Sequence, residues 1–294
     1  MHRKAVDRRS SLLARAVVAT VAGGCVIAVV SDAVAARRGG PVAVVPLGSF
    51  VDELASYDTS RWIKADRWTN GSPFDNAWRA DHVTHDATAA GGAMRLRLSN
   101  QRFLGEPYSA GEYRTRGFHG YGCYEARFKP ISQPGVVTSF FTFAGPYDNG
   151  GNGRHNEIDV EFLGKDTRRV QFNFWTNDDA YATHNEYLLD LGFDAAAAAH
   201  NYGFRWTATG IEWYVDGNRV YSFDGTPSNP TPRASDSYQK IMVNAWPVDA
   251  TAADWAGTFR YEGVREATYE WVRYDATPGC GFTANGASPA LRPA

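Results

Sequence analysis

An excess of positive charge and long uninterrupted apolar runs are both missing from this sequence. Its 294 residues carry 30 Lys and Arg against 32 Asp and Glu, whereas binding to nucleic acid or to an anionic membrane needs a basic face. The largely apolar run at residues 12–30 is interrupted by Arg15 and by Gly23 and Gly24, and is short for a stable membrane span. These absences argue against nucleic acid and membrane as partners. An apolar content of 44% is enough for a sizeable core.

Cysteine is scarce as well. Of the three cysteines, Cys25 lies inside the N-terminal apolar run and would be removed with it. Cys123 and Cys280 remain, an even number, which permits one disulfide in an exported protein. Two free thiols fit the sequence equally well, so the pairing stays open at this stage.

The N-terminus is typical of an export signal. Five basic residues precede or enter the apolar run, and Ala-Val-Ala at residues 33–35 forms a small-residue cleavage site. We expect a signal peptide at residues 1–35 and a secreted protein, either extracellular or periplasmic. An ordinary secretory signal is favoured over a twin-arginine signal, which Arg8 and Arg9 support only faintly. Taking five from 30 basic and two from 32 acidic residues leaves 25 and 30, a net charge of −5.

Helical periodicity and internal repeats are also lacking in the rest of the chain. After a short lead-in at residues 36–45, short apolar or alternating runs are separated by Gly, Pro, Asn and Asp. Many short strands without helical periodicity predict a sandwich or jelly roll of antiparallel sheets. We expect one such domain at residues 46–275. The composition then turns to Ala, Pro, Gly and Thr, which predicts a flexible tail at residues 276–294.

Two local segments give sharper predictions. Residues 211–223 are typical of a β-hairpin whose tight turn is formed by Asp216 and Gly217. Residues 194–200 contain five alanines and are the only stretch in which we expect a short helix, although a loop fits them equally.

One predicted strand carries an unusual row of acids. Residues 157–162 alternate acidic and apolar side chains, with the acids at Glu157, Asp159 and Glu161. Period 2 places the three acids on one face of a strand and the apolar side chains on the other. Like charges on one face repel one another, so stability does not explain the row. A solvated edge strand is the alternative, but lysines and mixed signs would then be expected.

Most glycoside hydrolases use a pair of carboxyl groups to catalyse the reaction. In a retaining mechanism the nucleophile and the general acid are about 5–5.5 Å apart. On a flat strand the Cα atoms of Glu157 and Glu161 would be roughly 13 Å apart, so the strand must lie on the concave face of a curved sheet. Asp159 between them would push the two glutamate pKa values apart, which lets identical side chains take different roles. The spacing does not assign the roles.

The segment Glu-Ile-Asp-Val-Glu-Phe-Leu-Gly-Lys-Asp-Thr at residues 157–167 resembles the active-site strand of glycoside hydrolase family 16. It is most similar to the bacterial lichenase type, the endo-β-1,3-1,4-glucanases, and the resemblance runs over about residues 62–274. It implies an all-β jelly roll of two antiparallel sheets with a concave cleft that binds β-glucan, in a monomeric, secreted, retaining endo-β-glucanase. It also implies that Glu157 is the nucleophile, Glu161 the general acid/base and Asp159 a supporting carboxylate.

Other predicted strands present polar and aromatic side chains on a common face. An aromatic ring offers a flat surface to the C–H face of a sugar, and Asn, Glu and Arg fix its hydroxyls. Each of these residues, taken singly, could equally be a core aromatic or a solvated polar group. The resemblance implies a substrate-binding role for eight residues: Asn70, Glu112, Arg114, Phe141, Asn173, Trp175, Asn244 and Trp246.

Two features depart from the lichenase pattern. His155 and Asn156 stand where Trp-Asp commonly precedes the first catalytic glutamate, so an aromatic sugar platform is lost or replaced there. The segment at residues 278–282 resembles that of bacterial exopolysaccharide-depolymerising members of the family. We therefore expect the substrate to be a mixed-linkage β-1,3-1,4-glucan or a related bacterial exopolysaccharide.

Two alternative functions use the same cleft. A transglycosylase of the same family would employ the same carboxylates, with a second sugar intercepting the glycosyl-enzyme in place of water. A non-catalytic jelly-roll lectin has no need of three carboxylates, so their presence favours the enzyme. The resemblance implies no required cofactor. It is compatible with a structural calcium held largely by backbone oxygens, for which the sequence identifies no ligands.

Overall fold

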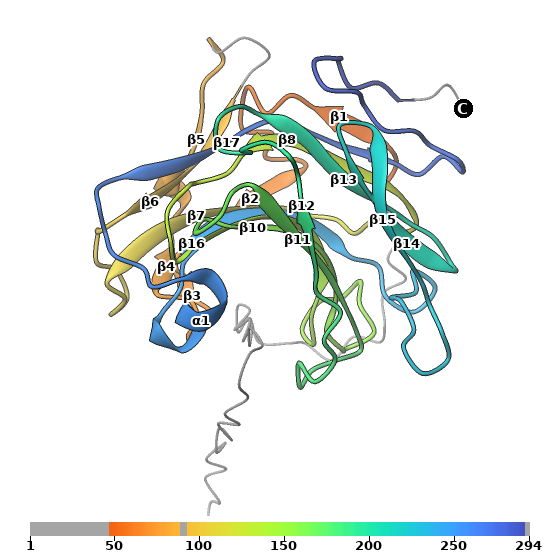
Figure 1. The fold of residues 1–294 in the computed structure, drawn as a ribbon, viewed down its shortest axis with the longest axis horizontal. Coiled ribbons are helices and arrows are strands. Elements are labelled where there is room, and N and C mark those ends of the chain that lie inside the picture. The colour runs from red at the N-terminus through yellow and green to blue at the C-terminus, as the bar shows by residue number, and fades with distance from the viewer. Residues whose placement is uncertain (1–46, 89–92, 292–294) are drawn as a thin grey trace, which may run out of the picture.

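The computed structural model describes residues 47–88 and 93–291. The predicted signal peptide and the whole of the predicted lead-in at residues 36–45 lie outside the described residues. Within the described part the chain forms 17 strands and little helix, in two curved layers that are visible in Figure 1. No helix in this part of the chain is long and apolar enough to cross a membrane.

The inner layer of Figure 1 holds the predicted acidic strand near its centre. Its spatial order is β2 (Trp62–Lys64), β7 (Tyr108–Thr115), β16 (Lys240–Pro247), β9 (Val136–Ala144), β10 (Asn156–Leu163), β11 (Arg169–Thr176) and β12 (Tyr187–Asp190). All of these neighbours are antiparallel, which suits a sheet whose two faces differ in polarity.

The outer layer covers the apolar face of the inner one. Its main row is β5 (Val83–His85), β6 (Met94–Ser99), β17 (Arg265–Asp275), β8 (Gly122–Lys129), β13 (His200–Trp206), β14 (Gly210–Val215) and β15 (Asn218–Asp224). The short β1 (Phe50–Asp52) also pairs with β17.

Strand β7 joins the two layers into one continuous, curled network. Its first residues pair with β6 and with β4 (Asn76–Trp78), and its later residues pair with β16 and β2. The β4–β7 pairing is parallel, and β3 (Trp68–Thr69) completes this edge. The remaining elements are the short 3-10 helices η1 (Ala80–His82) and η2 (Ala250–Ala252) and one α-helical turn, α1 (Ala253–Ala256).

The core lies between the layers, as the alternation in the acidic strand predicts. Ile158, Val160 and Phe162 are fully buried, and the Phe162 ring packs edge-on against Phe128 of β8 at 5.7 Å. Burying side chains of this size stabilises the fold by about 1.5–3 kcal/mol each. The predicted all-β jelly roll is confirmed, and its acids project from β10 on the side away from this core.

The predicted hairpin is confirmed at β14 and β15. Asp216 and Gly217 both adopt positive φ, 49° and 84°, which is the backbone of a type I′ turn and matches the twist of the two strands. Residues 195–197 form a turn, and the stretch contains no helix. Asp194 accepts hydrogen bonds from the Thr167 hydroxyl and from the Ala196 amide, and β13 begins at His200, so the alanine run is too short to continue.

The C-terminal segment differs from the predicted flexible tail. Cys280 forms a disulfide with Cys123 of β8, and the Phe282 ring stacks on Tyr214 at 3.8 Å. Thr283 donates two hydrogen bonds, each 2.8 Å, to the buried carboxylate of Glu125. These partners are far away in sequence, so composition alone could not reveal that this segment is anchored on the outer layer.

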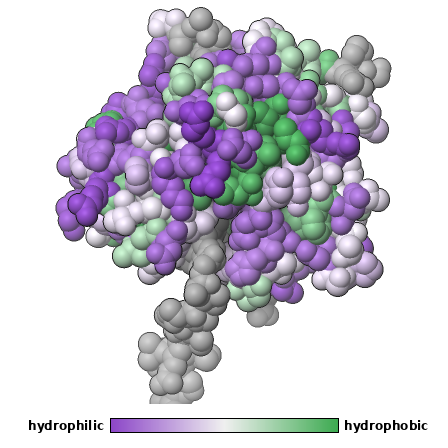
Figure 2. All heavy atoms as spheres, viewed as in Figure 1, coloured by the Kyte–Doolittle hydropathy of each residue, from purple (hydrophilic) through white to green (hydrophobic). Residues whose placement is uncertain are grey.

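The surface in the view of Figure 2 is mostly hydrophilic, with one compact hydrophobic area. Large exposed apolar side chains are scattered along the described residues: Leu47, Tyr57, Leu104, Tyr147, Tyr187, Leu188, Val264 and Leu291.

Candidate active site

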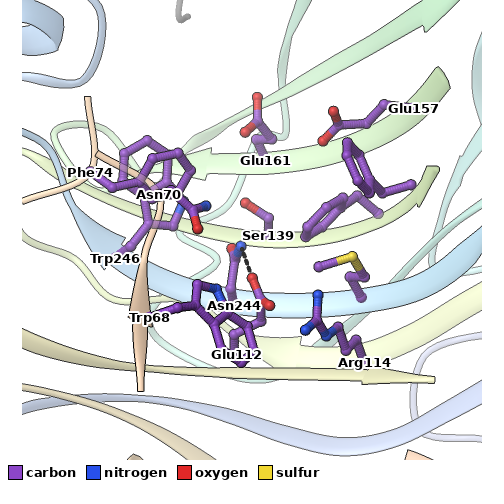
Figure 3. Close-up of a pocket in the computed structure, with 13 residues that line it drawn as sticks. Trp68, Asn70, Phe74, Glu112, Arg114, Ser139, Glu157, Glu161, Asn244 and Trp246 are labelled. Carbon is purple, nitrogen blue, oxygen red and sulfur yellow. Dashed lines mark hydrogen bonds between the residues drawn. The ribbon is translucent and has the colours of Figure 1, made fainter. Parts of the chain in front are cut away.

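A pocket lies on the concave face of the inner layer, where four neighbouring strands contribute side chains (Figure 3). The space between its lining atoms, part of which is open to solvent, amounts to about 460 Å³. Strands β7, β16, β9 and β10 form its floor, and the segment from β3 to β4 forms one wall. Its lining residues are Trp68, Asn70, Phe74, Glu112, Arg114, Ser139, Phe141, Phe143, Glu157, Glu161, Met242, Asn244 and Trp246.

Eight of the eleven predicted site residues line this pocket. They come from positions between 70 and 246 and are brought together by strand pairing: Asn70, Glu112, Arg114, Phe141, Glu157, Glu161, Asn244 and Trp246. The other three lie on the same face, Asp159 between Glu157 and Glu161 on β10 and the other two on the neighbouring strand β11. Asp159 is paired across the strands with Asn173, and Trp175 is paired with Glu157. The chemical roles of all eleven remain predictions.

Five lining residues were not among the predicted site residues. Ser139 and Phe143 flank Phe141 at period 2 on β9, and Met242 precedes Asn244 by two on β16. The same alternation that selected their neighbours could have found these three. Trp68 and Phe74 lie on either side of Asn70, in a segment too short and irregular to show a period.

Glu157 lies among aromatic side chains. Its cross-strand neighbours are Phe143 on β9 and Trp175 on β11. One carboxylate oxygen, Oε2, lies 2.5 Å from Nε2 of His155. Both side chains are almost fully buried, so this contact is shielded from water and electrostatically strong.

Glu161 lies among polar side chains. Its cross-strand neighbours are Ser139 and Gln171, and the Gln171 amide Nε2 donates to Glu161 at 3.1 Å. The indole of Trp255 in α1 donates to the other end of that amide, Gln171 Oε1, at 3.0 Å. Since the indole can only donate, it fixes Gln171 with its N–H toward Glu161.

Burial and, after it, the negative charge of Glu157 together raise the pKa of Glu161 to about 8. Burial also raises the pKa of Asp159 well above its usual range, with Glu157 and then Glu161 adding to the effect. A carboxyl group that keeps its proton near neutral pH can act as a general acid. The row of acids therefore contains a group, Glu161, that holds its proton at neutral pH.

The part of the pocket away from β10 is suited to sugar hydroxyls. Glu112 accepts a hydrogen bond of 3.4 Å from Asn244, and burial raises the pKa of Glu112. The Arg114 guanidinium lies over the Trp68 ring at 4.5 Å. Asn70 accepts from the Trp78 indole at 3.0 Å, which fixes its amide at the pocket wall.

Two predicted sugar-stacking tryptophans are largely occupied by packing. Trp246 is 1% exposed and its ring stacks on Phe74 at 3.8 Å. Trp175 is 2% exposed and stacks on His155 at 6.0 Å. Trp68 is more accessible, and its ring borders the pocket beside Arg114, so it offers more free aromatic surface than either.

A two-layered β-sheet fold carries a row of buried carboxylates, amides and aromatic rings across its concave face, and paired carboxyl groups of this kind are what glycoside hydrolysis requires. The sequence profile described as Glycosyl hydrolases family 16 matches residues 70–273. The chain belongs to this family.

Two similar relatives are bacterial proteins named Beta-glucanase. One, from Acetivibrio thermocellus, is 43% identical over 225 residues, which cover 76% of this chain and 62% of the relative. The match therefore spans less than two thirds of that protein's length. The other, from Bacillus subtilis, is 42% identical over 228 residues and covers 77% of this chain and 86% of the relative.

A solved structure supports the same assignment. The crystal structure of a prokaryotic β-1,3-1,4-glucanase (lichenase) from a mouse hindgut metagenome superposes with a TM-score of 0.69 at 38% identity. The match covers 79% of this chain and all of that one. The predicted resemblance to the lichenase type of family 16 is thereby confirmed.

Proposed function

We propose that this protein is a secreted, retaining endo-β-glucanase that hydrolyses internal linkages of mixed-linkage β-1,3-1,4-glucan. The observation that carries the proposal is the placement of Glu157 and Glu161 on one face of β10, inside one pocket, in a family 16 chain. The names of its relatives suggest the substrate. The pocket opens on the concave face, where a polymer can lie across several strands.

In the proposed mechanism Glu157 attacks the anomeric carbon while Glu161 protonates the departing sugar oxygen. The glycosyl-enzyme ester is then hydrolysed by water, from which Glu161 removes a proton. The pKa of about 8 at Glu161 supports its assignment as the acid, because it is protonated at neutral pH before substrate binds. Asp159, between the two, would hold a proton that it can share with Glu157.

The proposal is tested by reducing-end release from barley β-glucan, laminarin, xyloglucan and a succinoglycan-type polymer. We expect barley β-glucan to be cleaved fastest, with a rapid fall in viscosity because the cuts are internal. Binding of β-glucan without release of reducing ends would indicate a lectin. Transfer to added oligosaccharides in preference to water would indicate a transglycosylase.

A bacterial exopolysaccharide is the second candidate substrate, and His155 is the feature that favours it. The C-terminal segment resembling exopolysaccharide depolymerases packs on the outer layer through Cys280 and Phe282, so it does not contact the pocket. The replacement at His155, by contrast, borders the nucleophile. Faster cleavage of the succinoglycan-type polymer than of barley β-glucan would favour this second candidate.

Export is proposed from the N-terminal sequence, and the Cys123–Cys280 disulfide is compatible with an oxidising compartment. N-terminal sequencing of the protein recovered outside the cytoplasm should begin at Ala36. We further propose that it acts as a monomer, which light scattering on a size-exclusion column will test.

A structural calcium is proposed on the resemblance. No group of three or more His, Cys, Asp and Glu side chains in residues 47–88 and 93–291 is arranged to hold a metal ion, so backbone oxygens would supply most ligands. Asp275 at the end of β17 fits as a side-chain ligand, because its buried Oδ2 has no hydrogen-bond partner among the described residues. We expect CaCl₂ to raise the Tm above its value in EDTA, and Asp275→Ala to remove the difference.

A further inference from the structure

The residue two positions before Glu157 is in direct contact with it. His155 directly precedes β10, and period 2 places its side chain on the same face as Glu157. The separation of 2.5 Å between His155 Nε2 and Glu157 Oε2 is that of a short, charge-assisted hydrogen bond. His155 is 2% exposed, so water does not compete for this bond.

The imidazole ring is held by three aromatic neighbours. Phe143 lies at 5.3 Å, Tyr181 at 4.8 Å and Trp175 at 6.0 Å between ring centroids. Its backbone is fixed as well, because the His155 amide donates to Asp179 at 2.7 Å. The ring therefore has little freedom to turn away from Glu157.

The surroundings of the two ring nitrogens determine where the proton lies. An ionised nucleophile can only accept, so the hydrogen bond requires the proton on Nε2. Nδ1 is buried and has no hydrogen-bond partner among the described residues. An N–H at Nδ1 would be a buried donor without an acceptor, which is unfavourable. The neutral Nε2–H tautomer satisfies both conditions.

We propose that His155 is a positioning residue for the nucleophile, a role that rests on the proposed retaining function. By holding Oε2, it leaves Oε1 of Glu157 free to form the bond to the anomeric carbon as the bond to the leaving oxygen breaks and Glu161 gives up its proton. In the resulting ester Oε2 is the carbonyl oxygen, and Nε2–H still donates to it. When water cleaves the ester, the electron pair returns to a carboxylate that His155 already stabilises. His155 keeps its proton throughout.

The other charged groups near Glu157 are acids, whose negative charge the His155 donor helps to offset. Asp159 and Glu161 from β10 and Glu112 from β7 all interact electrostatically with it. No Lys or Arg in the described part of the chain lies within ion-pair distance of Glu157, and the basic side chain that contacts it is His155. A hydrogen-bond donor from outside the row of acids therefore favours the ionised nucleophile.

The test compares His155→Gln, which keeps an N–H donor, with His155→Met, which has similar length and no donor. For His155→Met we expect kcat/KM on barley β-glucan to fall roughly 10- to 100-fold. Loss of a donor raises the pKa of the carboxylate it served, so the acidic limb of the pH profile should move up by about one unit. His155→Gln should recover much of the rate and most of the limb position.

The matched control is His200→Met on the outer layer, where a histidine also hydrogen-bonds an acid, Asp216, at 2.7 Å. It should leave the pH profile unchanged. Equal losses for the Gln and Met variants with an unmoved acidic limb would show that His155 serves packing only, and the inference would be overturned. A wild-type rate in His155→Met would overturn it too.

A measurement on the unaltered protein removes any dependence on how the variants fold. ¹⁵N-histidine NMR should show His155 as the Nε2–H tautomer, and its signals should shift in Glu157→Ala. The Nδ1–H tautomer would contradict the inference. The proposed function fails separately, if the wild-type protein releases no reducing ends from any glucan, so the two failures are distinguishable.

Discussion

Glu157 and Glu161 are the same residue type on the same face of the same strand, yet β10 carries them into different surroundings. Glu157 has Phe143 and Trp175 as its cross-strand neighbours and His155 as its hydrogen-bond partner. Glu161 has Ser139 and Gln171 beside it. At one end of β10 the carboxylate is surrounded by aromatic rings and has one fixed hydrogen-bond donor. At the other end the carboxylate is surrounded by polar side chains.

This difference indicates that the neighbouring strands, and not the acids themselves, set the different proposed roles of Glu157 and Glu161. Burial raises the pKa values of both Asp159 and Glu161. The Glu161 pKa of about 8 reflects burial and the charge of Glu157, opposed by the Gln171 hydrogen bond. Each partner can be removed singly, which gives experiments that break or sharpen the contrast.

The largest effects should come from removing the acids. Glu157→Ala should be inactive on polymer and on activated aryl glycosides, because no other group can form the ester. Glu161→Ala should lose roughly 10²- to 10⁴-fold on polymer but retain turnover of an activated aryl glycoside, whose leaving group needs no proton. Azide should rescue the first with an inverted anomeric product and the second with a retained one. Azide products of the opposite configurations would reverse the assignment.

The next largest effect should come from changing the hydrogen bond to Glu161. With Glu161 as the acid, activity is lost as pH rises through its pKa of about 8. The Gln171 N–H favours the ionised carboxylate, so Gln171→Leu should raise that pKa and move the alkaline limb upward by up to about one unit. Trp255→Phe frees the Gln171 amide and should shift the limb less. Gln101→Leu, at an exposed position outside the pocket, is the control. A downward shift of the alkaline limb in Gln171→Leu would contradict this prediction.

Substitution of Trp246 tests whether this tryptophan serves core packing or sugar binding. Its ring is buried between Phe74 and Trp255, so Trp246→Ala should reduce the free energy of unfolding by about 3–5 kcal/mol. Trp68→Ala, at a more accessible ring, should raise KM with little loss of stability. Denaturant unfolding and steady-state kinetics on both variants check this. A stable Trp246→Ala with a raised KM would make Trp246 a sugar platform.

The smallest effect on activity should follow loss of the disulfide. Cys123 and Cys280 are 157 residues apart in sequence and lie on the outer layer. Replacing both with Ala should cost about 2–4 kcal/mol of stability and leave both limbs of the pH profile in place. Thermal unfolding and the pH profile of kcat/KM at 25 °C measure the two parts. A moved limb would show that the outer layer influences β10.

Local patterns predicted a good part of the fold. The alternation at residues 157–162 correctly placed Ile158 and Val160 in the core, because a strand has a fixed period whatever its partners are. Asp216 and Gly217 predicted their turn because a type I′ turn requires positive φ at both positions. The alanine run at residues 194–200 was a weak signal, since β13 begins at His200 and a stretch this short has too few residues for helix propensity to stabilise a helix.

Contacts between segments that are far apart in the chain could not be predicted from the sequence. Gln171 and Trp255 are 84 positions apart, and nothing in either segment indicates that the indole orients the amide. The anchoring of residues 280–283 on the outer layer was missed for the same reason. His155 stood out as a departure from the family pattern, but its hydrogen bond to Glu157 depends on the enclosure built by Phe143, Trp175 and Tyr181.

The sequence by itself determined that three acids share one face of a strand, and through its resemblance to a family it indicated what such acids do. Only the tertiary structure decided the environment of each acid. The physical reason is that side-chain alternation is a property of one strand, whereas burial, hydrogen bonding and charge coupling are set by the strands that pair beside it. In this protein β9 and β11 supply aromatic neighbours at Glu157 and polar neighbours at Glu161.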